Sequence, residues 1–375
     1  MTIDVRIKRL WDSQSLLWHY MEKVSLRFGG NMITLLDKLE KEHTLSLEKY
    51  EILLKNRDED FRQVMFEKAL KVRRQHYGND VYVRGLIEFT NYCKNNCYYC
   101  GIRAGNANAQ RYRLTEEEII DCCDRGYETG YRTFVLQGGE DAFFTPEKIV
   151  DLICRIKERY SDCALTLSIG EHTKDIYKMW KEAGADRYLL RHETADSEHY
   201  RKLHPKEMLL ENRKQCLYDL RELGYQVGCG FMVGSPLQTY EHLAKDLKFI
   251  EEFRPHMVGI GPFISHKDTP FADKENGSVE LTLWLLALIR LIVPNVLLPA
   301  TTALGTLQDN GRELGILAGA NVCMPNLSPE NVRKKYMLYD NKLSTGEESA
   351  EEFIKLCKKM NKIGYNVVVH RGDCK

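Results

Sequence analysis

The stretch EFTNYCKNNCYYCGIR, residues 88–103, carries three cysteines, Cys93, Cys97 and Cys100, in the order C-x-x-x-C-x-x-C. Three thiolates on one short loop can bind three irons of a cubane iron–sulfur cluster and leave the fourth iron without a protein ligand. An open iron of this kind can bind a small molecule through an amine and a carboxylate. The spacing therefore predicts a 4Fe–4S cluster with one open coordination site.

A structural zinc site and chance clustering are the alternatives. Zinc normally takes four ligands, and the usual sequence pattern contains C-x-x-C twice. The chain has no second C-x-x-C, and the nearest upstream histidine is His76. A disulfide framework fits poorly because the chain is large and its other cysteines are scattered. We therefore prefer the arrangement of radical SAM enzymes, in which S-adenosylmethionine (SAM) binds the open iron.

Composition narrows the classes of partner. Lys+Arg and Asp+Glu balance at 54 each, so neither a nucleic acid nor an anionic membrane is indicated. The first residues, MTIDVRIKRLWDSQ, carry charges where a signal peptide needs an apolar core. An apolar run over residues 281–300 has the length of a membrane span, but Arg290, Pro294 and Asn295 interrupt it. We expect a cytoplasmic protein in which this run forms a buried helix, a turn and a short strand.

Strand-like and helix-like stretches alternate eight times between residues 81 and 326. The expected strands are 81–89, 133–141, 164–171, 186–193, 225–234, 256–263, 295–302 and 320–326. The expected helices between them are 114–130, 145–160, 174–184, 209–224, 240–253, 281–293 and 311–319. This predicts an α/β fold, a TIM-type (β/α)8 barrel. An open doubly wound sheet is the alternative, but it would rarely need eight evenly spaced units.

Three regions are expected along the chain. Residues 1–80 form a helical N-terminal extension that packs on the barrel or plugs its closed end. Residues 81–330 form the barrel, and residues 331–375 form a tail of helix and strand. The role of residues 1–34 is open.

Polar residues fall on or just after the expected strands, and in such a barrel the chemistry lies at the C-terminal ends of the strands. Together they predict one polar cavity around the cluster. They are Arg84 and Glu88; Gly138, Gly139 and Glu140; Thr166, Ser168 and Glu171; Arg187, Arg191, His192 and Glu193; Met232 and Gly234; and Thr301 and Thr302. The positive charges on the fourth strand suggest an anionic substrate, or they balance Glu171 and Glu193.

The cysteine loop and the glycine pair offer contacts for SAM. Tyr99 can lie against an adenine ring, or can simply pack the loop. Gly138, Gly139 and Glu140 combine close backbone approach with a carboxylate, which suits the SAM amine. The alternative for these three is an ordinary turn from strand to loop.

Two charged residues could contact SAM, and each could equally have an ordinary structural role. Arg213, on the fourth helix, can pair with the SAM carboxylate, or it is a solvated helix arginine. Glu193 can accept hydrogen bonds from the ribose hydroxyls, or it forms an ion pair with Arg191 or Arg187.

Several stretches resemble the HydE family, the radical SAM maturases of FeFe-hydrogenase. Besides the cysteine loop they are LQGGED, LSIGE, GADRYLLRHETAD, MVGSPLQT, MVGIGPFISHKDTP and LPATTALGT, in the same order from about residue 35 to about residue 340. The resemblance implies that Cys93, Cys97 and Cys100 are the cluster ligands. It implies SAM contacts at Gln137, Gly139, Glu193, Arg213 and Met232.

The same resemblance implies a substrate cavity inside the barrel. It is lined by Thr166, Arg187, Thr301 and Thr302, to which we add Ser168. There the family is thought to process an iron–cyanide–carbonyl synthon that carries cysteine. The partners implied are this small organometallic or amino-acid-derived substrate, the scaffold and synthon-forming maturases, and an electron donor.

The chain departs from the family pattern near its C-terminus. Many members carry a second cysteine trio there, but residues 339–353, YDNKLSTGEESAEEF, contain no cysteine. Cys357 and Cys374 are too isolated to replace it, so we predict a single cluster.

Three other functions compete. Methylornithine synthase has a similar layout but lacks the RYLLRHETA run. Biotin synthase needs further cysteines on the barrel strands, where only Cys229 and Cys323 lie here. A non-catalytic iron–sulfur scaffold or carrier is the alternative from another class.

Overall fold

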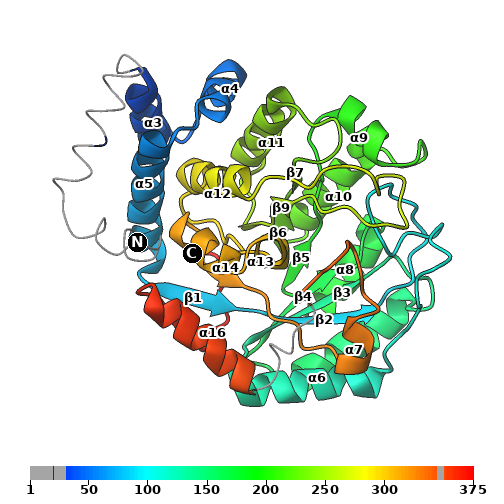
Figure 1. Cartoon of the computed structure of the whole chain (residues 1–375). Helices are drawn as coiled ribbons and strands as arrows, with labels where there is room; N and C mark the ends of the chain where they lie inside the picture. Colours follow the sequence, from blue (N-terminus) through cyan, green and yellow to red (C-terminus); the bar gives the residue numbers. More distant parts are fainter. Residues whose placement is uncertain (1–19, 21–30, 344–349) are drawn as a thin grey trace.

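The computed structural model describes residue 20, residues 31–343 and residues 350–375, so the expectations for residues 1–19, 21–30 and 344–349 lie outside the described residues (Figure 1). Six parallel strands form one sheet in the order β2-β3-β4-β5-β6-β8. Their bounds are β2 (Gly85–Thr90), β3 (Thr133–Gly138), β4 (Ala164–Ser168), β5 (Arg187–Leu189), β6 (Gln226–Cys229) and β8 (Met257–Val258).

Short parallel pairings close this sheet into a barrel. Met257 of β8 pairs with Leu297, Pro299 pairs with β10 (Val322–Cys323), and Leu86 of β2 pairs with Asn326. β10 also pairs with β1 (Asp80–Val83), which precedes β2. The predicted (β/α)8 architecture is therefore confirmed, and helices surround the strands (Figure 1).

The helices of the barrel begin where the sequence supplies caps. Thr115 and Glu118 form a capping box at the start of α6, and Thr145 caps α7 just before a proline. Each such cap stabilises its helix by about 1 kcal/mol. The helices are α6 (Glu116–Thr129), α7 (Pro146–Arg159), α8 (Lys174–Glu182), α9 (Ser197–Leu203), α10 (Leu210–Glu222), α11 (Tyr240–Phe253), α12 (Val279–Ile292), α13 (Thr302–Leu307) and α14 (Gly311–Leu317).

Most of the expected strands are shorter than predicted or are divided into two, and two of them show why. The stretch 225–234 divides at Gly230, and its second part, β7 (Met232–Val233), pairs with β9 (Gly261–Pro262). A Cβ on Gly230 would lie 2.0 Å from the Gly259 carbonyl oxygen, so the two backbones approach more closely than a side chain allows. The stretch 295–302 makes only the isolated pairings named above, because Pro299 has no N–H to donate.

The apolar run forms α12, and its helical residues from Leu281 onward are buried in the protein core. Arg290 is also buried, and its guanidinium donates to the carbonyl oxygens of Gly319, Pro294 and Val296. Within the residues that the structure describes, no helix is long and apolar enough to cross a membrane.

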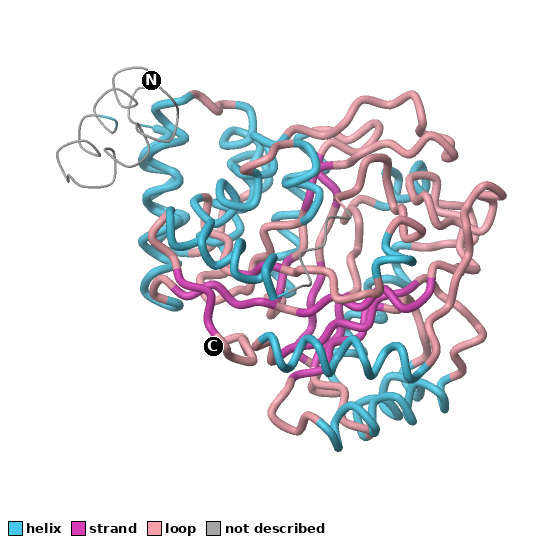
Figure 2. The backbone as a smooth tube through the Cα atoms, turned by 60° about the horizontal axis from the view of Figure 1, so that its bottom comes forward, coloured by secondary structure: helices cyan, strands magenta, loops and turns pink. Residues whose placement is uncertain are grey.

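The N-terminal helices lie against the side of the barrel. They are α3 (Asn31–Glu42), α4 (Leu47–Lys55) and α5 (Glu59–Tyr77); α5 packs against α12, and α4 packs against α11. Glu251 of α11 accepts hydrogen bonds from Thr44 (2.6 Å) and Tyr50 (2.7 Å). In Figure 2 the long loops lie on the side of the strands away from these helices.

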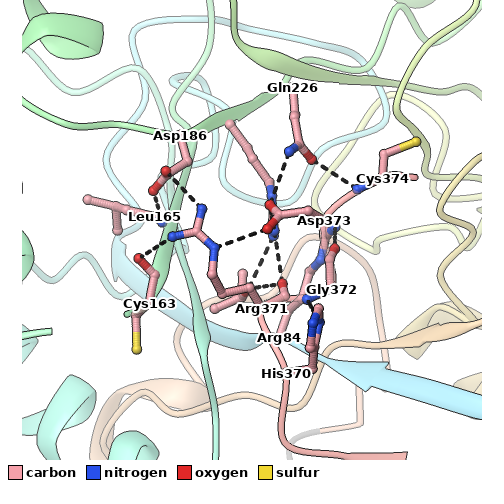
Figure 3. A network of polar contacts seen from close by, with 12 residues as sticks. Arg84, Cys163, Leu165, Asp186, Gln226, His370, Arg371, Gly372, Asp373 and Cys374 are labelled. Carbon is pink, nitrogen blue, oxygen red and sulfur yellow. Dashed lines mark hydrogen bonds and ion pairs between the residues drawn. The ribbon is translucent and has the colours of Figure 1, made fainter. Parts of the chain in front are cut away.

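The end of the barrel where the strands begin is closed by the C-terminus, which the sequence did not predict. After α15 (Glu330–Arg333) and α16 (Ala350–Lys362), β11 (Asn366–Val368) pairs in parallel with β1. The residues that follow, from His370 to Cys374, lie beside Asp186 and Gln226, which stand just before and at the start of their strands (Figure 3). Arg371 contacts Asp186 (3.1 Å), and Asp373 accepts from Arg187 (2.6 Å) and Gln226 (3.0 Å).

Candidate active site at the mouth of the barrel

The cysteine loop leaves the end of β2 and is fastened to three other parts of the mouth. Lys94 donates its backbone N–H to the carbonyl oxygen of Glu140, just after β3 (2.9 Å). Tyr98 donates to the Leu203 carbonyl oxygen at the end of α9 (3.0 Å). Gly101 donates to the carbonyl oxygen of Leu338 (2.8 Å). These bonds hold the loop over the C-terminal ends of the strands, where a barrel enzyme places its chemistry.

Cys93, Cys97 and Cys100 are free, partly buried thiols. Burial raises the pKa of Cys93, raises that of Cys97 to about 12, and raises that of Cys100 further. The loop by itself therefore disfavours thiolates, and iron would supply the positive charge that stabilises them. In the described ranges, no three His, Cys, Asp or Glu side chains converge closely enough to bind one metal ion. A cubane cluster does not need this convergence, since each cysteine binds a different iron.

The glycine pair after β3 lies directly against the loop. A Cβ on Gly139 would lie 2.2 Å from the Tyr92 carbonyl oxygen and 2.6 Å from the Cys93 Cβ. The Glu140 N–H donates to the Cys93 sulfur at 3.4 Å. Only glycine allows this approach, which leaves the first cysteine beside backbone groups that can face a cluster and its ligand.

The carboxylate of Glu140 already has protein partners. It accepts from the Glu171 N–H (3.0 Å) and pairs with the Lys94 ammonium (3.0 Å). Gln137, two positions before Gly139, is adjacent to Ser168 across the sheet. Gly138 is the last residue of β3.

Two predicted SAM contacts are engaged in ion pairs beside the loop. Arg213 is 8% exposed, and its Nε lies 2.7 Å from the Glu171 carboxylate. Glu193 pairs with Arg191 at 2.9 Å, which is the alternative that its sequence context offered. Glu193 also has a positive φ of 65°, an uncommon conformation for a residue other than glycine. It is held there by pairing between its own backbone and Phe231.

An apolar cluster completes the loop's surroundings. Met232, Leu203 and Phe263 are buried together, and Tyr99 and Phe271 pack against them. The sequence singled out Tyr99 and Met232. It missed Leu203 and Phe263, because a lone apolar residue in a helix or strand has no feature that distinguishes a pocket from the core.

The predicted substrate residues fall at different heights in the barrel. The hydroxyls of Thr166 and Thr301 are buried and have no hydrogen-bond partner among the residues that the structure describes. Ser168 ends β4, and Thr302 begins α13. Arg187 begins β5 and is bound by Asp373, so it lies toward the closed end.

Thr166 and Arg187 line a small interior cavity. Its other polar lining residues are Arg84, Gln226 and His256. Among the described residues, the Nε atoms of Arg84 and Arg187 are buried there without hydrogen-bond partners. Unpaired buried donors of this kind suit an anionic group, but the cavity as it stands, about 10 Å³, has room for about one water molecule.

A segment that the sequence did not single out crosses the mouth. Leu338 accepts from the cysteine loop, Asp340 donates to the Ser265 carbonyl oxygen (3.0 Å), and Leu343 donates to the Thr306 hydroxyl (3.3 Å). Between these points Lys342 reaches into the barrel and pairs with Glu88 on β2. We call residues 334–343 the mouth strap. Its sequence has no periodicity that would have revealed this path.

The residues around the loop fit a 4Fe–4S cluster and SAM. Three thiols lie on one loop, glycine allows close approach beside them, a buried arginine and a carboxylate lie near, and an apolar cluster offers an aromatic side chain.

Comparison with known proteins agrees with this geometry. Residues 87–250 match the Radical SAM superfamily. The chain is 46% identical over 314 residues to the FeFe hydrogenase maturase subunit HydE of Thermotoga maritima, covering 84% of this chain and 89% of that protein. It is 29% identical over 324 residues to 3-methylornithine synthase of Methanosarcina acetivorans, covering 85% and 90%. The crystal structure of methylornithine synthase (PylB) matches with a TM-score of 0.77 at 27% identity, covering 89% of this chain and 97% of that one.

Proposed function

This chain belongs to the HydE family of radical SAM enzymes, and we propose that its reaction serves the assembly of the diiron site of an FeFe-hydrogenase. As a radical SAM enzyme it uses a 4Fe–4S cluster and SAM, so it is not a non-catalytic carrier. Held by Cys93, Cys97 and Cys100, the cluster would, once reduced, supply the electron for reductive cleavage of SAM to methionine and a 5′-deoxyadenosyl radical.

The protein's own residues would bind the cluster, orient SAM on it and shield both from water. We propose that Cys93, Cys97 and Cys100 hold the cluster. Backbone groups at Gly138 and Gly139, with Glu140 beside them, would receive the SAM amine. The bonds described above already hold this turn against the first cysteine, so little reorganisation is needed when SAM binds.

The other SAM groups have candidate partners around the same loop. Arg213 would share its guanidinium between Glu171 and the SAM carboxylate. Glu193 would turn from Arg191 to the ribose hydroxyls. Gln137, next to the last residue of β3, would add a polar contact, and Tyr99 and Met232 would cover the adenine.

The substrate proposal rests on the barrel interior. We propose that a small organometallic or amino-acid-derived anion is held below SAM by Thr166, Ser168, Arg187, Thr301 and Thr302. The observation that carries this is the set of buried polar atoms without partners: the Thr166 and Thr301 hydroxyls and the Arg187 Nε. A closed barrel also keeps water away from a reactive radical.

The partners follow from this role. We propose that the protein works with other maturases, which form the synthon and provide the scaffold, and that an electron donor reduces the cluster. Co-expression of an FeFe-hydrogenase apoprotein with the other maturases tests the role. Active hydrogenase should appear with this chain and be lost when Cys97 is replaced by alanine.

Methylornithine synthesis is the second candidate, because both the sequence and the fold resemble 3-methylornithine synthase. The two functions separate in the products. Purified, reconstituted protein that forms methylornithine, and fails to support hydrogenase maturation, would reverse the preference.

A further inference from the structure

The end of α9 forms a support for the second half of the cysteine loop. The Tyr98 N–H donates to the Leu203 carbonyl oxygen at 3.0 Å. The sulfur of Cys97 lies 3.9 Å from the sulfur of Met208. Between these contacts, the Tyr99 hydroxyl lies 3.0 Å from the Nε2 atom of His204. Three consecutive loop residues thus rest on one short stretch, residues 203–208.

The hydrogen bonds of His204 define its tautomer. Its Nδ1 lies 3.0 Å from the backbone carbonyl oxygen of Tyr200, and a carbonyl oxygen can only accept. Nδ1 therefore carries the proton, and in the neutral ring Nε2 must accept. The Tyr99 O–H consequently donates to His204. Burial lowers the pKa of His204 to about 3, so the ring is neutral near pH 7.

The imidazole itself is firmly placed. His204 is 1% exposed and stacks on the Tyr200 ring, with centroids 3.9 Å apart and planes at 21°. Tyr99 meets it edge-on, with centroids 5.3 Å apart and planes at 90°. The same Tyr99 ring packs against Leu203 and Met232. The hydrogen bond therefore fixes the direction of a ring that packs on the apolar cluster beside Cys97 and Cys100.

We propose that His204 is a positioning residue for SAM: by accepting a hydrogen bond from the Tyr99 hydroxyl it holds the Tyr99 ring in the orientation that receives the adenine. The inference rests on the proposed SAM contacts and deepens them. Because the Tyr99 hydroxyl is already satisfied by His204, the ring needs no polar group of SAM to hold it. Its contribution is a preformed apolar surface, which spares SAM binding the cost of ordering that side chain.

Equilibrium binding to the anaerobically reconstituted protein tests this, with two probes. SAM carries the adenine. L-Methionine carries the same amine, carboxylate and thioether sulfur without it. His204→Leu removes the acceptor, Tyr99→Phe removes the donor, and His204→Gln keeps an acceptor at a similar distance. His199→Leu is the matched control, because His199 is equally buried on α9 but bonds to Thr194 and Pro236 instead of the loop.

We expect His204→Leu and Tyr99→Phe each to raise the dissociation constant for SAM about tenfold, which is typical of losing one buried hydrogen bond. The double variant should lose no more than either single variant, because both act on one bond. His204→Gln should recover most of the affinity. Methionine affinity and the visible absorbance of the cluster should stay at the wild-type level throughout, as should SAM affinity in His199→Leu.

The inference is overturned if His204→Leu binds SAM within twofold of wild type, if SAM and methionine weaken equally, or if His204→Gln is as impaired as His204→Leu. Should His204→Leu fail to fold, Tyr99→Phe with His204→Gln decides the matter alone. A wild-type protein that binds no SAM would instead contradict the proposed function itself.

Discussion

Replacing Asp373 with asparagine should destabilise the barrel from its closed end. Asp373 lies on the C-terminal tail, 186 residues from Arg187, and the two side chains meet at 2.6 Å. Burial opposes ionisation of Asp373, but the hydrogen bonds and charges of Arg187 and Arg371 outweigh it and hold its pKa well below the usual range. The carboxylate therefore stabilises the fold when it is ionised.

The expected loss of stability depends on the hydrogen bonds that Arg187 would retain without the Asp373 carboxylate. Breaking a fully buried ion pair costs about 3–5 kcal/mol. Here the Arg187 side chain is 3% exposed and that of Asp373 is 35% exposed, so water screens part of the interaction. Arg187 also retains the Arg371 carbonyl oxygen (2.8 Å) and the Thr133 hydroxyl (3.1 Å). We therefore expect a loss of about 2 kcal/mol, or a fall in Tm of roughly 2–3 °C for a chain of this length.

The effect of Asp373→Asn on stability should also depend on pH. A carboxyl group whose folded pKa is depressed contributes stability above its unfolded pKa and loses that contribution as pH falls toward the folded pKa. The difference between wild type and Asp373→Asn should thus be full at pH 7 and shrink below about pH 4, near the ordinary aspartate pKa.

Equilibrium unfolding in urea at pH 7, 5, 4 and 3 provides the assay. Asp162→Asn is the matched control, because Asp162 pairs with Arg132 at 3.0 Å but is 52% exposed. It should change the free energy of unfolding by less than about 1 kcal/mol. The free energy of unfolding of Asp373→Asn could instead lie within about 0.5 kcal/mol of wild type at pH 7, or the difference between the two proteins could grow as pH falls. Either result would show that Asp373 does not stabilise the fold through its ion pair with Arg187.

Three further changes have definite expected outcomes. Gly139→Ala should reduce the iron bound after reconstitution, because its Cβ would lie 2.2 Å from the Tyr92 carbonyl oxygen; iron content equal to wild type would contradict the close approach. Lys342→Met should lower the free energy of unfolding by roughly 2–4 kcal/mol. Glu88 would stay buried, and among the described residues Asn326 would be its one remaining side-chain partner. An unchanged urea midpoint would show that the mouth strap does not depend on this pair. Thr301→Val should leave thermal stability unchanged or higher, because the buried hydroxyl has no partner, while hydrogenase maturation in co-expression falls; full maturation would remove Thr301 from the substrate site.

The barrel and the cysteine loop could be predicted because their signals are local. Strands such as 133–138 are continuous apolar runs, and helices such as α6 begin with a capping box, so a window of a few residues contains the information. The position of the cysteine loop at the mouth of the barrel followed from the strand that precedes it. The resemblance to the HydE family then added Gln137 and Met232 to the expected SAM contacts. It also assigned Thr166, Arg187, Thr301 and Thr302 to a substrate cavity.

The parts that could not be predicted depend on contacts between distant segments. Glu88 and Lys342 are 254 residues apart, and no local pattern marks either as a partner of the other. Arg187 was assigned to the substrate cavity from its strand, and the structure adds a partner from the tail that its neighbours in sequence do not reveal. His204 was not singled out, because a lone histidine after a helix is usually structural. Its function follows from the bond to Tyr99, which only the folded chain shows.

The most direct test of the central claim is an iron count combined with SAM cleavage on the same anaerobically reconstituted protein. The account predicts about four irons per chain, as one cubane cluster requires, and 5′-deoxyadenosine formed from SAM after reduction with dithionite. In Cys97→Ala both the cubane absorbance and the 5′-deoxyadenosine should disappear together. A wild-type chain that forms no 5′-deoxyadenosine, or a variant lacking Cys93, Cys97 and Cys100 that still holds a cluster, would contradict it.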